Sequence, residues 1–376
     1  MHISFNGSER ATLGVEVELE IVDRGTRQLA SAATDVLAEL GAGGAHAKVK
    51  HELFECTAEV ITGICDTVAE ARDDLAASIK ELTAVTGRRG LALMCSGSHP
   101  ISRWHDQVVS PDPRYHGLIE EMQWAARRMQ IFGVHVHVGV KSGERAIAIA
   151  NALNTCIPHF LALSASSPYW AGRDTGMASC RSTVFESLPT AGLPYLLSGW
   201  SEFEQFMETL VAAQAITGVR EVWWDIRPHP DFGTVELRIC DGMPTLTEVS
   251  AVAALAQSVV ESFDNRLDRG EPLPRPREWT VRQNKWRAAR HGLDAEIITD
   301  DRGGRTPLRR AISDLVEELS PVAEGLGCLE ELRLNLRTLE HGASYERQRR
   351  VVAAGGTMTD VVDSLVSEFE SDRPRA

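Results

Sequence analysis

The sequence has no run of about 18 apolar residues, the length that a transmembrane helix needs. Its first residues, Met1–Gly7, have neither the basic nor the apolar region of a secretory signal. Hydrophobic residues make up 43% and charged residues 24% of the 376 positions, which is typical of a globular protein in water. We therefore expect a cytoplasmic protein without a membrane partner.

Basic residues are in deficit. The chain has 39 Lys and Arg against 53 Asp and Glu, which gives a net charge of −14 at pH 7. Because a broad nucleic-acid-binding surface is basic, we expect no nucleic-acid partner. A local basic pocket for a small polyanion stays compatible with this charge.

Two kinds of motif are also missing. The seven cysteines are scattered and never stand in C-x-x-C spacing, so neither a zinc cluster nor a disulfide framework is expected, and the thiols are read as reduced and buried. The phosphate-binding motif G-x-x-x-x-G-K-[ST] and the kinase H-R-D motif are absent. Metal ions and arginine side chains would therefore have to hold any bound triphosphate.

The segment Gly14–Asp23 alternates between apolar and acidic residues, which predicts a β-strand. Glu16, Glu18 and Glu20 share one face, roughly 7 Å apart, and the apolar residues at 15, 17, 19 and 21 share the other. A row of like charges is unfavourable unless water screens it or a cation neutralises it. The strand alone is compatible with a solvated face, or with a carboxylate platform for divalent metal.

Two other segments repeat this division into an apolar and a charged face. If Lys50–Val60 is one strand, Glu55 and Glu59 share a face. A Pro/Gly turn at 228–233 separates two more strands, and the second strand carries Glu236 beside Arg238 on its polar face. These faces add further carboxylates and one guanidinium to the predicted sheet.

The segment Gly133–Gly139 places two histidines on one strand face. His135 and His137 alternate with valines that point to the other face. A single histidine here would most often be a hydrogen-bonded core or surface residue. Two on one face make a role as metal ligands about as credible as a structural one.

The remaining chain is read mainly as helices. Helices are expected near 33–40, 66–86, 113–129, 144–165 and 279–291, with a break at Pro158 in the fourth. Gly41–Gly44 would end the first helix, and Asp66 would cap the second. Capping boxes at Ser201–Glu204 and Thr245–Glu248 would open two further helices. From Thr245 onward the pattern is helical to the C-terminus. Strands followed by a helical third predict an α+β fold with an antiparallel sheet.

Stacked in one sheet, the four strands would present five or six carboxylates, two imidazoles and an arginine on one face. Mostly oxygen ligands suit Mg²⁺ or Mn²⁺ better than zinc. Enzymes commonly hold Mg²⁺ with a few carboxylates and the phosphates of a substrate. This face therefore predicts several Mg²⁺ ions with a nucleoside triphosphate across them.

The motifs that carry these residues resemble the carboxylate-amine ligases of glutamate–cysteine ligase type 2. They are Gly14–Glu18, Glu55 with Glu59–Cys65, Gly97–Pro100, His135–Gly139, Ser164–Gly176, Asp225–Pro228 with Gly233–Arg238, and Arg287–Asp294. The resemblance runs through nearly the whole chain in order. It implies one catalytic domain over 1–376, with 245–376 as its mostly helical part.

The resemblance also implies a sheet of the glutamine-synthetase-like kind. Its active-site face would be open and would bind Mg-ATP, with helices covering the other face. The implied reaction joins the γ-carboxylate of L-glutamate to the amine of L-cysteine through an acyl phosphate. Mg²⁺, with Mn²⁺ possible, is the implied cofactor, and ATP is the cosubstrate. The other partners are small-molecule substrates, and a homo-oligomer is possible.

Carried over position by position, the resemblance gives a set of site residues. The metal ligands are Glu16, Glu18, Glu55, Glu236 and one of His135 and His137, with His135 favoured. Glu59 is a ligand or supports one, and Arg238 contacts phosphate; these two are the candidate catalytic residues. Candidates for further ATP contacts are Arg287 and Arg290, and candidates for a substrate carboxylate are Arg173, Arg181 and Arg227. Glu20 is read as a third residue on a wet face, and the Ser164–Gly176 loop as a substrate lid.

Three alternatives stay open at the level of the sequence. The same chemistry serves a different amine acceptor equally well. A metal-dependent hydrolase would use the His-x-His strand to bind zinc and activate water. A non-catalytic relative would bind a nucleotide or an amino acid without turnover.

Overall fold

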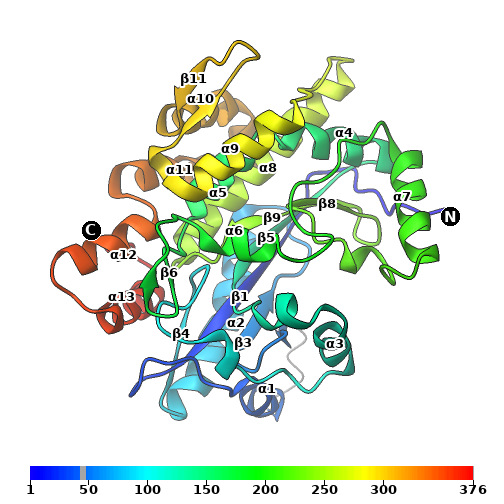
Figure 1. The fold of residues 1–376 in the computed structure, drawn as a ribbon. Coiled ribbons are helices and arrows are strands. Elements are labelled where there is room, and N and C mark those ends of the chain that lie inside the picture. The colour runs from blue at the N-terminus through cyan, green and yellow to red at the C-terminus, as the bar shows by residue number, and fades with distance from the viewer. Residues whose placement is uncertain (43–47, 376) are drawn as a thin grey trace.

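Antiparallel strands form the centre of the computed structural model, which describes residues 1–42 and 48–375 (Figure 1). Within those residues seven strands form one sheet in the order β2-β3-β1-β5-β9-β8, and β4 pairs with β1 as well. The strands are β1 (Leu13–Asp23), β2 (Val49–His51), β3 (Thr57–Ile61), β4 (Leu91–Met94), β5 (Gly133–Gly139), β8 (Ile226–His229) and β9 (Thr234–Asp241). The predicted α+β fold with an antiparallel sheet is confirmed.

The central strand β1 has the two faces that its alternation predicts. Its apolar side chains at 15, 17, 19 and 21 are buried. Strands of this sheet are packed against helices α2 (Val68–Arg88), α4 (Gly143–Leu153), α5 (Ile157–Ser164) and α8 (Leu246–Asp268). On the polar face, β1 lies between β3 and β5, with Glu18 opposite Glu59 and Glu16 opposite His135. In the next pair of strands, β5 and β9, His137 lies opposite Glu236. Antiparallel pairing therefore gathers the polar residues of four segments that are distant in sequence.

Helices account for most of the remaining chain. They are α1 (Ala33–Ala42), α2 (Val68–Arg88), α3 (Pro113–Arg127), α4 (Gly143–Leu153), α5 (Ile157–Ser164), α6 (Cys180–Phe185), α7 (Trp200–Ala212), α8 (Leu246–Asp268), α9 (Glu278–His291), α10 (Leu308–Leu326), α11 (Leu329–His341), α12 (Ser344–Ala353) and α13 (Met358–Ser371). The predicted break at Pro158 is confirmed, because α5 begins there as a separate helix with the proline in its first turn. In Figure 1 the yellow and orange helices α8 to α11 lie together, away from α1 and α3.

The C-terminal helices share the core of the sheet. One hydrophobic cluster includes Val15 of β1, Val252 of α8, Ile312 of α10 and Leu332 of α11. Within residues 1–42 and 48–375, no single helix combines the length and the apolar content that crossing a membrane requires. Helices α4 and α5 reach the required length and apolar content only when they are counted as one segment, and they are bent by 67° where they meet.

Several local predictions are corrected. Thr67, rather than Asp66, caps α2, and α7 begins at Trp200, so Ser201 is not its cap. The short hairpins β6 (Tyr169–Trp170) with β7 (Arg173–Asp174) and β10 (Glu296–Ile298) with β11 (Arg305–Pro307) were not predicted. Strands of two or three residues are too short to show a period of two. Gly43 and Gly44, expected to end α1, lie outside the described residues.

The segment Lys50–Val60 is a hairpin and not the single strand that its sequence suggests. β2 and β3 pair antiparallel, with Lys50 opposite Glu59, so the chain reverses direction between His51 and Thr57. The period-two relation that placed Glu55 on one face with Glu59 does not hold across a reversal.

Glu20 is fully buried, which corrects its reading as a residue on a wet face. Its Oε1 accepts hydrogen bonds from Ser96 N at 3.0 Å and from Ser96 Oγ at 2.7 Å, whereas its Oε2 has no partner among the described residues. Burial raises the pKa of Glu20 to about 8, because the two bonds from Ser96 offset the loss of water only in part.

We expect Glu20→Gln to change how stability depends on pH. The unfolded chain releases the Glu20 proton near its ordinary pKa of 4.5 and the folded protein near 8, so the parent loses stability as the pH rises between these values. Glutamine accepts the same bonds without ionising. The free energy of unfolding of the variant, relative to the parent, should therefore increase by about 2–4 kcal/mol from pH 5 to pH 8.5.

Urea unfolding at both pH values measures this difference, and any constant cost of the amide cancels in the comparison. Glu330→Gln, at a side chain that is 89% exposed, is the matched control and should show no such trend. A parallel pH dependence of the parent and Glu20→Gln would contradict the prediction.

Candidate functional site: an acidic sheet face

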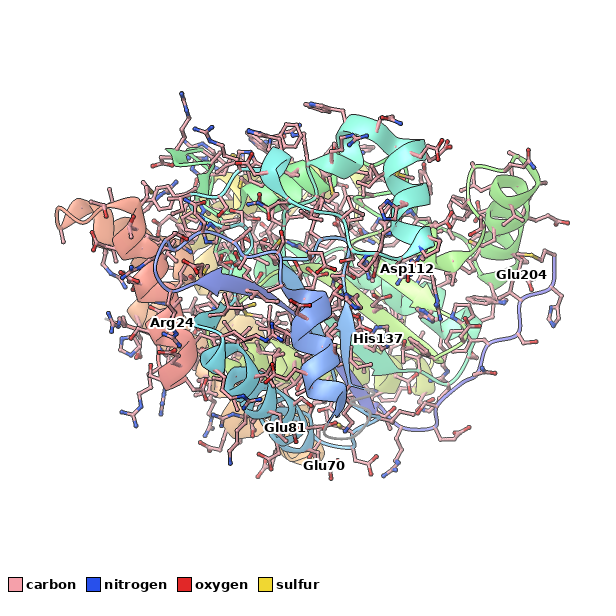
Figure 2. The ribbon with its side chains drawn as sticks, turned by 90° about the horizontal axis from the view of Figure 1, so that it is seen from below. Arg24, Glu70, Glu81, Asp112, His137 and Glu204 are labelled. Carbon is pink, nitrogen blue, oxygen red and sulfur yellow. The ribbon has the colours of Figure 1, made fainter. Side chains whose placement is uncertain are left out.

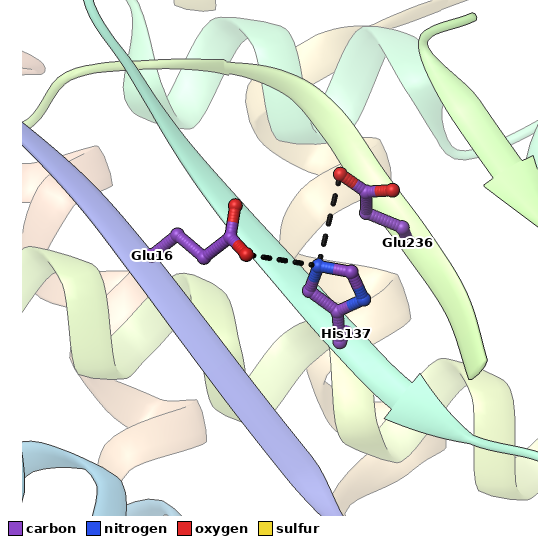
Figure 3. A group of neighbouring side chains, drawn as sticks. All are labelled: Glu16, His137 and Glu236. Atoms are coloured by element: carbon purple, nitrogen blue, oxygen red, sulfur yellow. Dashed lines mark ion pairs between the residues drawn. The ribbon is translucent and has the colours of Figure 1, made fainter. Parts of the chain in front are cut away.

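Glu16 is the centre of the polar face, because its carboxylate lies close to both histidines of the neighbouring strand. Figure 3 shows it beside one of them, His137. Glu16 Oε2 is 3.1 Å from His135 Nδ1, and Glu16 Oε1 is 3.5 Å from His137 Nε2. The side chain of Glu16 is 24% exposed, whereas both histidines are buried. One carboxylate thus faces two imidazoles and still reaches solvent.

A first group of potential metal ligands consists of Glu16, His137 and Glu236. His137 Nε2 lies 3.7 Å from Glu236 Oε1, and its Nδ1 is 3.0 Å from Thr234 Oγ1. Thr234 thereby fixes the ring, while Nε2 is buried without a hydrogen-bond partner among the described residues. In Figure 3 this nitrogen points between the two carboxylates.

A second group consists of Glu16, Glu59 and His135. In each group, one ligand atom from every residue lies within 4.8 Å of the others, and Glu16 is common to both groups. Carboxylate oxygens with an imidazole nitrogen form a donor set that Mg²⁺ or Mn²⁺ accepts. The unpartnered nitrogen of His137 fits the same interpretation, so the residues present fit two adjacent divalent cations.

The carboxylates of this face have strongly different proton affinities. Burial raises the pKa of Glu16, but the hydrogen bond with His135 and the nearby imidazole of His137 outweigh it and hold the pKa well below its usual range. Burial raises the pKa of Glu18 to about 7, and the charge of Glu52 adds to this increase. Burial likewise raises the pKa of Glu59 well above its usual range, with contributions from the neighbouring carboxylates. The raised pKa values of Glu18 and Glu59 mean that this face lacks enough positive charge to keep all of its carboxylates ionised.

Glu52 belongs to this acidic face, although no motif or strand pattern in the sequence indicates it. After burial, the charge of Glu52 is the main cause of the raised pKa of both Glu18 and Glu59. Its own pKa is raised by burial, and its Oε2 accepts a bond from Leu53 N at 2.7 Å. Glu52 follows β2 directly, where the hairpin reverses, so no strand periodicity indicates its direction.

Two arginines neutralise Glu236, which is completely buried. Arg227 Nη2 lies 2.7 Å from Glu236 Oε2, and Arg238 Nη1 lies 2.5 Å from Glu236 Oε1. Burial raises the pKa of Glu236, but the two guanidinium charges more than offset this and lower it well below its usual range. Glu236 is thus kept ionised next to His137.

The role predicted for Arg227, binding a substrate carboxylate, is corrected by these contacts. Its Nε and Nη2 are both directed to Glu236, and its Nη1 donates to the carbonyls of Val219 and Val222 at 3.1 Å each. Because these donors are used within the protein and the side chain is buried, Arg227 orients Glu236 rather than presenting a guanidinium to a ligand.

Glu55 lies away from both groups, which corrects its prediction as a metal ligand. Its Oε1 accepts from Thr34 Oγ1 at 2.6 Å and its Oε2 from Thr34 N at 3.0 Å. Both carboxylate oxygens therefore serve the first turn of α1. The cause is the reversal between β2 and β3, which turns Glu55 out of the face that Glu59 occupies.

The other predicted arginines are not gathered at the two groups. Arg287 donates to the Glu296 carbonyl on β10, and Arg290 donates to the Gly176 carbonyl. Arg173 is exposed on β7. Arg181 is buried on α6 and donates to the carbonyls of Ile239 and Arg238 at 3.4 and 3.3 Å. Direct ligand contacts of these four arginines stay predictions.

The segment predicted as a lid is mostly fixed. Asp241, at the end of β9, accepts bonds from Ser166 N, Ser167 Oγ and Ser179 Oγ at 3.0, 2.7 and 2.8 Å. Residues 164–169 are buried, and within 164–176 only the tip at 172–174 is exposed. The prediction of a lid over Ser164–Gly176 is therefore narrowed to this tip.

The fold is that of a known ligase. A crystal structure of glutamate–cysteine ligase from Francisella tularensis in complex with AMP superposes on it with a TM-score of 0.71, covering 98% of this chain and 90% of that one at 13% identity. This likeness defines the class of fold, an antiparallel sheet with helices as in that ligase.

The sequence gives the family. The chain belongs to glutamate–cysteine ligase family 2, whose sequence model matches residues 12–368. A relative from Frankia casuarinae, provisionally named glutamate–cysteine ligase 2-1, is 57% identical over 378 residues, covering 100% of this chain and 99% of the relative. A Thermobifida fusca relative, provisionally named glutamate–cysteine ligase 2, is 54% identical over 377 residues, with 100% and 94% covered. The resemblance drawn from the motifs is confirmed.

Removing the shared ligand should weaken both cation sites. We expect Glu16→Gln to lower the affinity for Mn²⁺ by at least about tenfold, because an amide supplies no charge and Glu16 contributes to both groups. Titration followed by electron paramagnetic resonance measures free Mn²⁺ directly. Glu55→Gln is the matched control, since its oxygens bond Thr34, and it should bind Mn²⁺ like the parent. Equal losses in the two variants would refute the assignment.

Proposed function

We propose that residues 1–376 act as one catalytic domain, which uses ATP to join the γ-carboxylate of L-glutamate to the amine of L-cysteine. The observation that carries this proposal is the pair of ligand groups that share Glu16, with Arg238 beside them, in a chain of this ligase family. Such a face suits a triphosphate whose charge is spread over several cations.

A carboxylate is a poor electrophile, so the reaction needs an activated form. In the first proposed step of the reaction, the γ-carboxylate of glutamate attacks the terminal phosphorus of ATP, and ADP leaves. The amine of cysteine then attacks the acyl carbon, and inorganic phosphate leaves. Bound Mg²⁺ or Mn²⁺ would neutralise the phosphate oxygens during the transfer.

The residues of the chain would position this reaction. Glu16, His137 and Glu236 would hold one cation, and Glu16, Glu59 and His135 the other. No covalent enzyme nucleophile is required. Holding the reactants in a reactive geometry can by itself contribute roughly 7–11 kcal/mol to lowering the barrier.

Arg238 is proposed to contact the transferred phosphoryl group. Its Nη1 is used by Glu236 and lies 3.5 Å from His135 Nδ1, whereas its Nε is buried without a partner among the described residues. A guanidinium beside cation ligands, with a donor still available, is well placed to stabilise negative charge that develops in the transition state.

Replacement of Arg238 should remove this stabilisation. With glutamate, cysteine, ATP and Mg²⁺, we expect Arg238→Ala to lower kcat by about 10²–10³, and Arg238→Lys to recover part of the loss. A coupled assay for ADP measures the rate, and mass spectrometry identifies the dipeptide. Arg310→Ala, at a side chain that is 76% exposed, is the control and should keep the parental rate.

The same assay separates the alternatives. ADP release that needs glutamate but prefers another amine would move the proposal to a different acceptor. Hydrolysis that needs metal but no ATP would favour a hydrolase. Binding of ATP by the parent with no turnover for any acceptor would refute the enzyme assignment.

A further inference from the structure

The turn between β8 and β9 carries a phenylalanine that is 54% exposed and lies next to a potential metal ligand. We propose that Phe232 is the platform on which the base of the bound nucleoside triphosphate stacks. This inference rests on the proposed function, since it requires ATP phosphates at the group formed by Glu16, His137 and Glu236.

Phe232, His229 and the potential metal ligand His137 form one cluster of three aromatic rings. Phe232 stacks on His229 with ring centroids 4.1 Å apart and planes inclined by 6°. Its ring is also 5.5 Å from the ring of His137, and that of His229 is 5.7 Å from His137. His229 is buried, so the Phe232 ring has an imidazole behind it and remains open to solvent. The nitrogen of His137 that faces Glu16 and Glu236 belongs to the same cluster of rings.

The N-terminal segment fixes the turn in place. Asn6 N donates to the Pro230 carbonyl at 3.0 Å, and Asn6 Nδ2 donates to the Asp231 carbonyl at 2.9 Å. Gly233 has a φ of +65°, and a Cβ there would lie 1.7 Å from the Asn6 carbonyl oxygen. The approach of the two backbones is therefore so close that only glycine fits.

The segment is anchored in turn at α7. Ile3 N donates to Glu204 Oε1 at 2.7 Å, and Trp200 Nε1 donates to the Ile3 carbonyl at 3.1 Å. In Figure 2 Glu204 lies at the periphery beside the N-terminal segment, whereas His137 lies toward the middle of the molecule. The turn that carries Phe232 thus lies between the anchored N-terminal segment, residues 3–6, and the acidic face. This fixes the position of Phe232 before a ligand binds, as a preorganised contact requires.

The chemistry of a nucleotide matches this arrangement. Its phosphates need cations, and its base presents a flat π-face that stacks on aromatic rings regardless of hydrogen-bonding pattern. An exposed ring directly beside the cation ligands offers both contacts to one molecule. Residues 231–233 spell the kinase motif Asp-Phe-Gly, but they form the turn between two antiparallel strands, so a kinase-like role is not inferred.

Calorimetric binding measurements with two probes in the presence of Mg²⁺ test the proposal. ATP has a base, whereas inorganic tripolyphosphate has the phosphates alone. We expect Phe232→Ala to raise the Kd for ATP by about tenfold or more, to leave the Kd for tripolyphosphate unchanged, and to raise the KM for ATP with little change in kcat. Phe232→Tyr retains the ring and should bind ATP like the parent.

Trp279→Ala is the matched control, because Trp279 is an aromatic residue of α9 that is 68% exposed, and it should bind both probes like the parent. If Phe232→Ala keeps the parental affinity for ATP, the inference is overturned while the proposed ligase stands. An equal loss for both probes also overturns it, since Phe232 would then act on the phosphate site. A parent protein that binds no ATP overturns the inference together with the proposed function.

Discussion

The crowding of carboxylates on one face of the sheet is the constraint on which the site depends. Glu16, Glu18, Glu52 and Glu59 come from β1 and the β2–β3 hairpin, and burial raises the proton affinity of three of them. Only Glu16 is held firmly ionised, by the two histidines of β5. Such a face is costly unless protons or cations occupy it. The same crowding that opposes folding in the absence of a ligand therefore favours binding of divalent ions.

Glu236 is stabilised in a different way, because the protein supplies its counter-charges. Arg227 and Arg238 hold one oxygen each. Removing one partner of a buried ion pair typically costs about 3–5 kcal/mol, since the other charge is left buried without compensation. The carboxylate of Glu236 beside His137 is thus fixed in position and charge, whereas burial leaves the carboxylates of Glu18 and Glu59 with raised pKa values. In the proposed site, these carboxylates would exchange protons for cations. Arg227 contributes to the site through this positioning and not through contact with a ligand.

The sequence predicted the parts of the site that lie within regular strands. A period of two placed Glu16 and His135 on the polar faces of their strands, and Glu236 beside Arg238, because the side of a strand follows directly from alternation. The pairing that brings Glu16 opposite His135 comes from the structure. The prediction from sequence failed at Glu55 and Glu52, because the hairpin reverses the chain between β2 and β3 and ends the alternation. It also could not assign the arginines, since a long flexible side chain reaches partners on other elements. Arg227 bonds to Glu236, while Arg290 bonds to the carbonyl of Gly176.

Strand β9 connects the potential metal ligands to residues 164–182. At one end, Glu236 and Arg238 face the histidines of β5; at the other, Asp241 accepts three bonds from the serines of 166–179. Arg181 joins the two ends, because it donates to the carbonyls of Ile239 and Arg238 while its charge lowers the pKa of Glu18. A Cβ at Gly133 would lie 2.3 Å from Arg181 Nη2, so a larger residue where β5 begins would have to displace this guanidinium. The acidic face and residues 164–182 are therefore both anchored on strand β9.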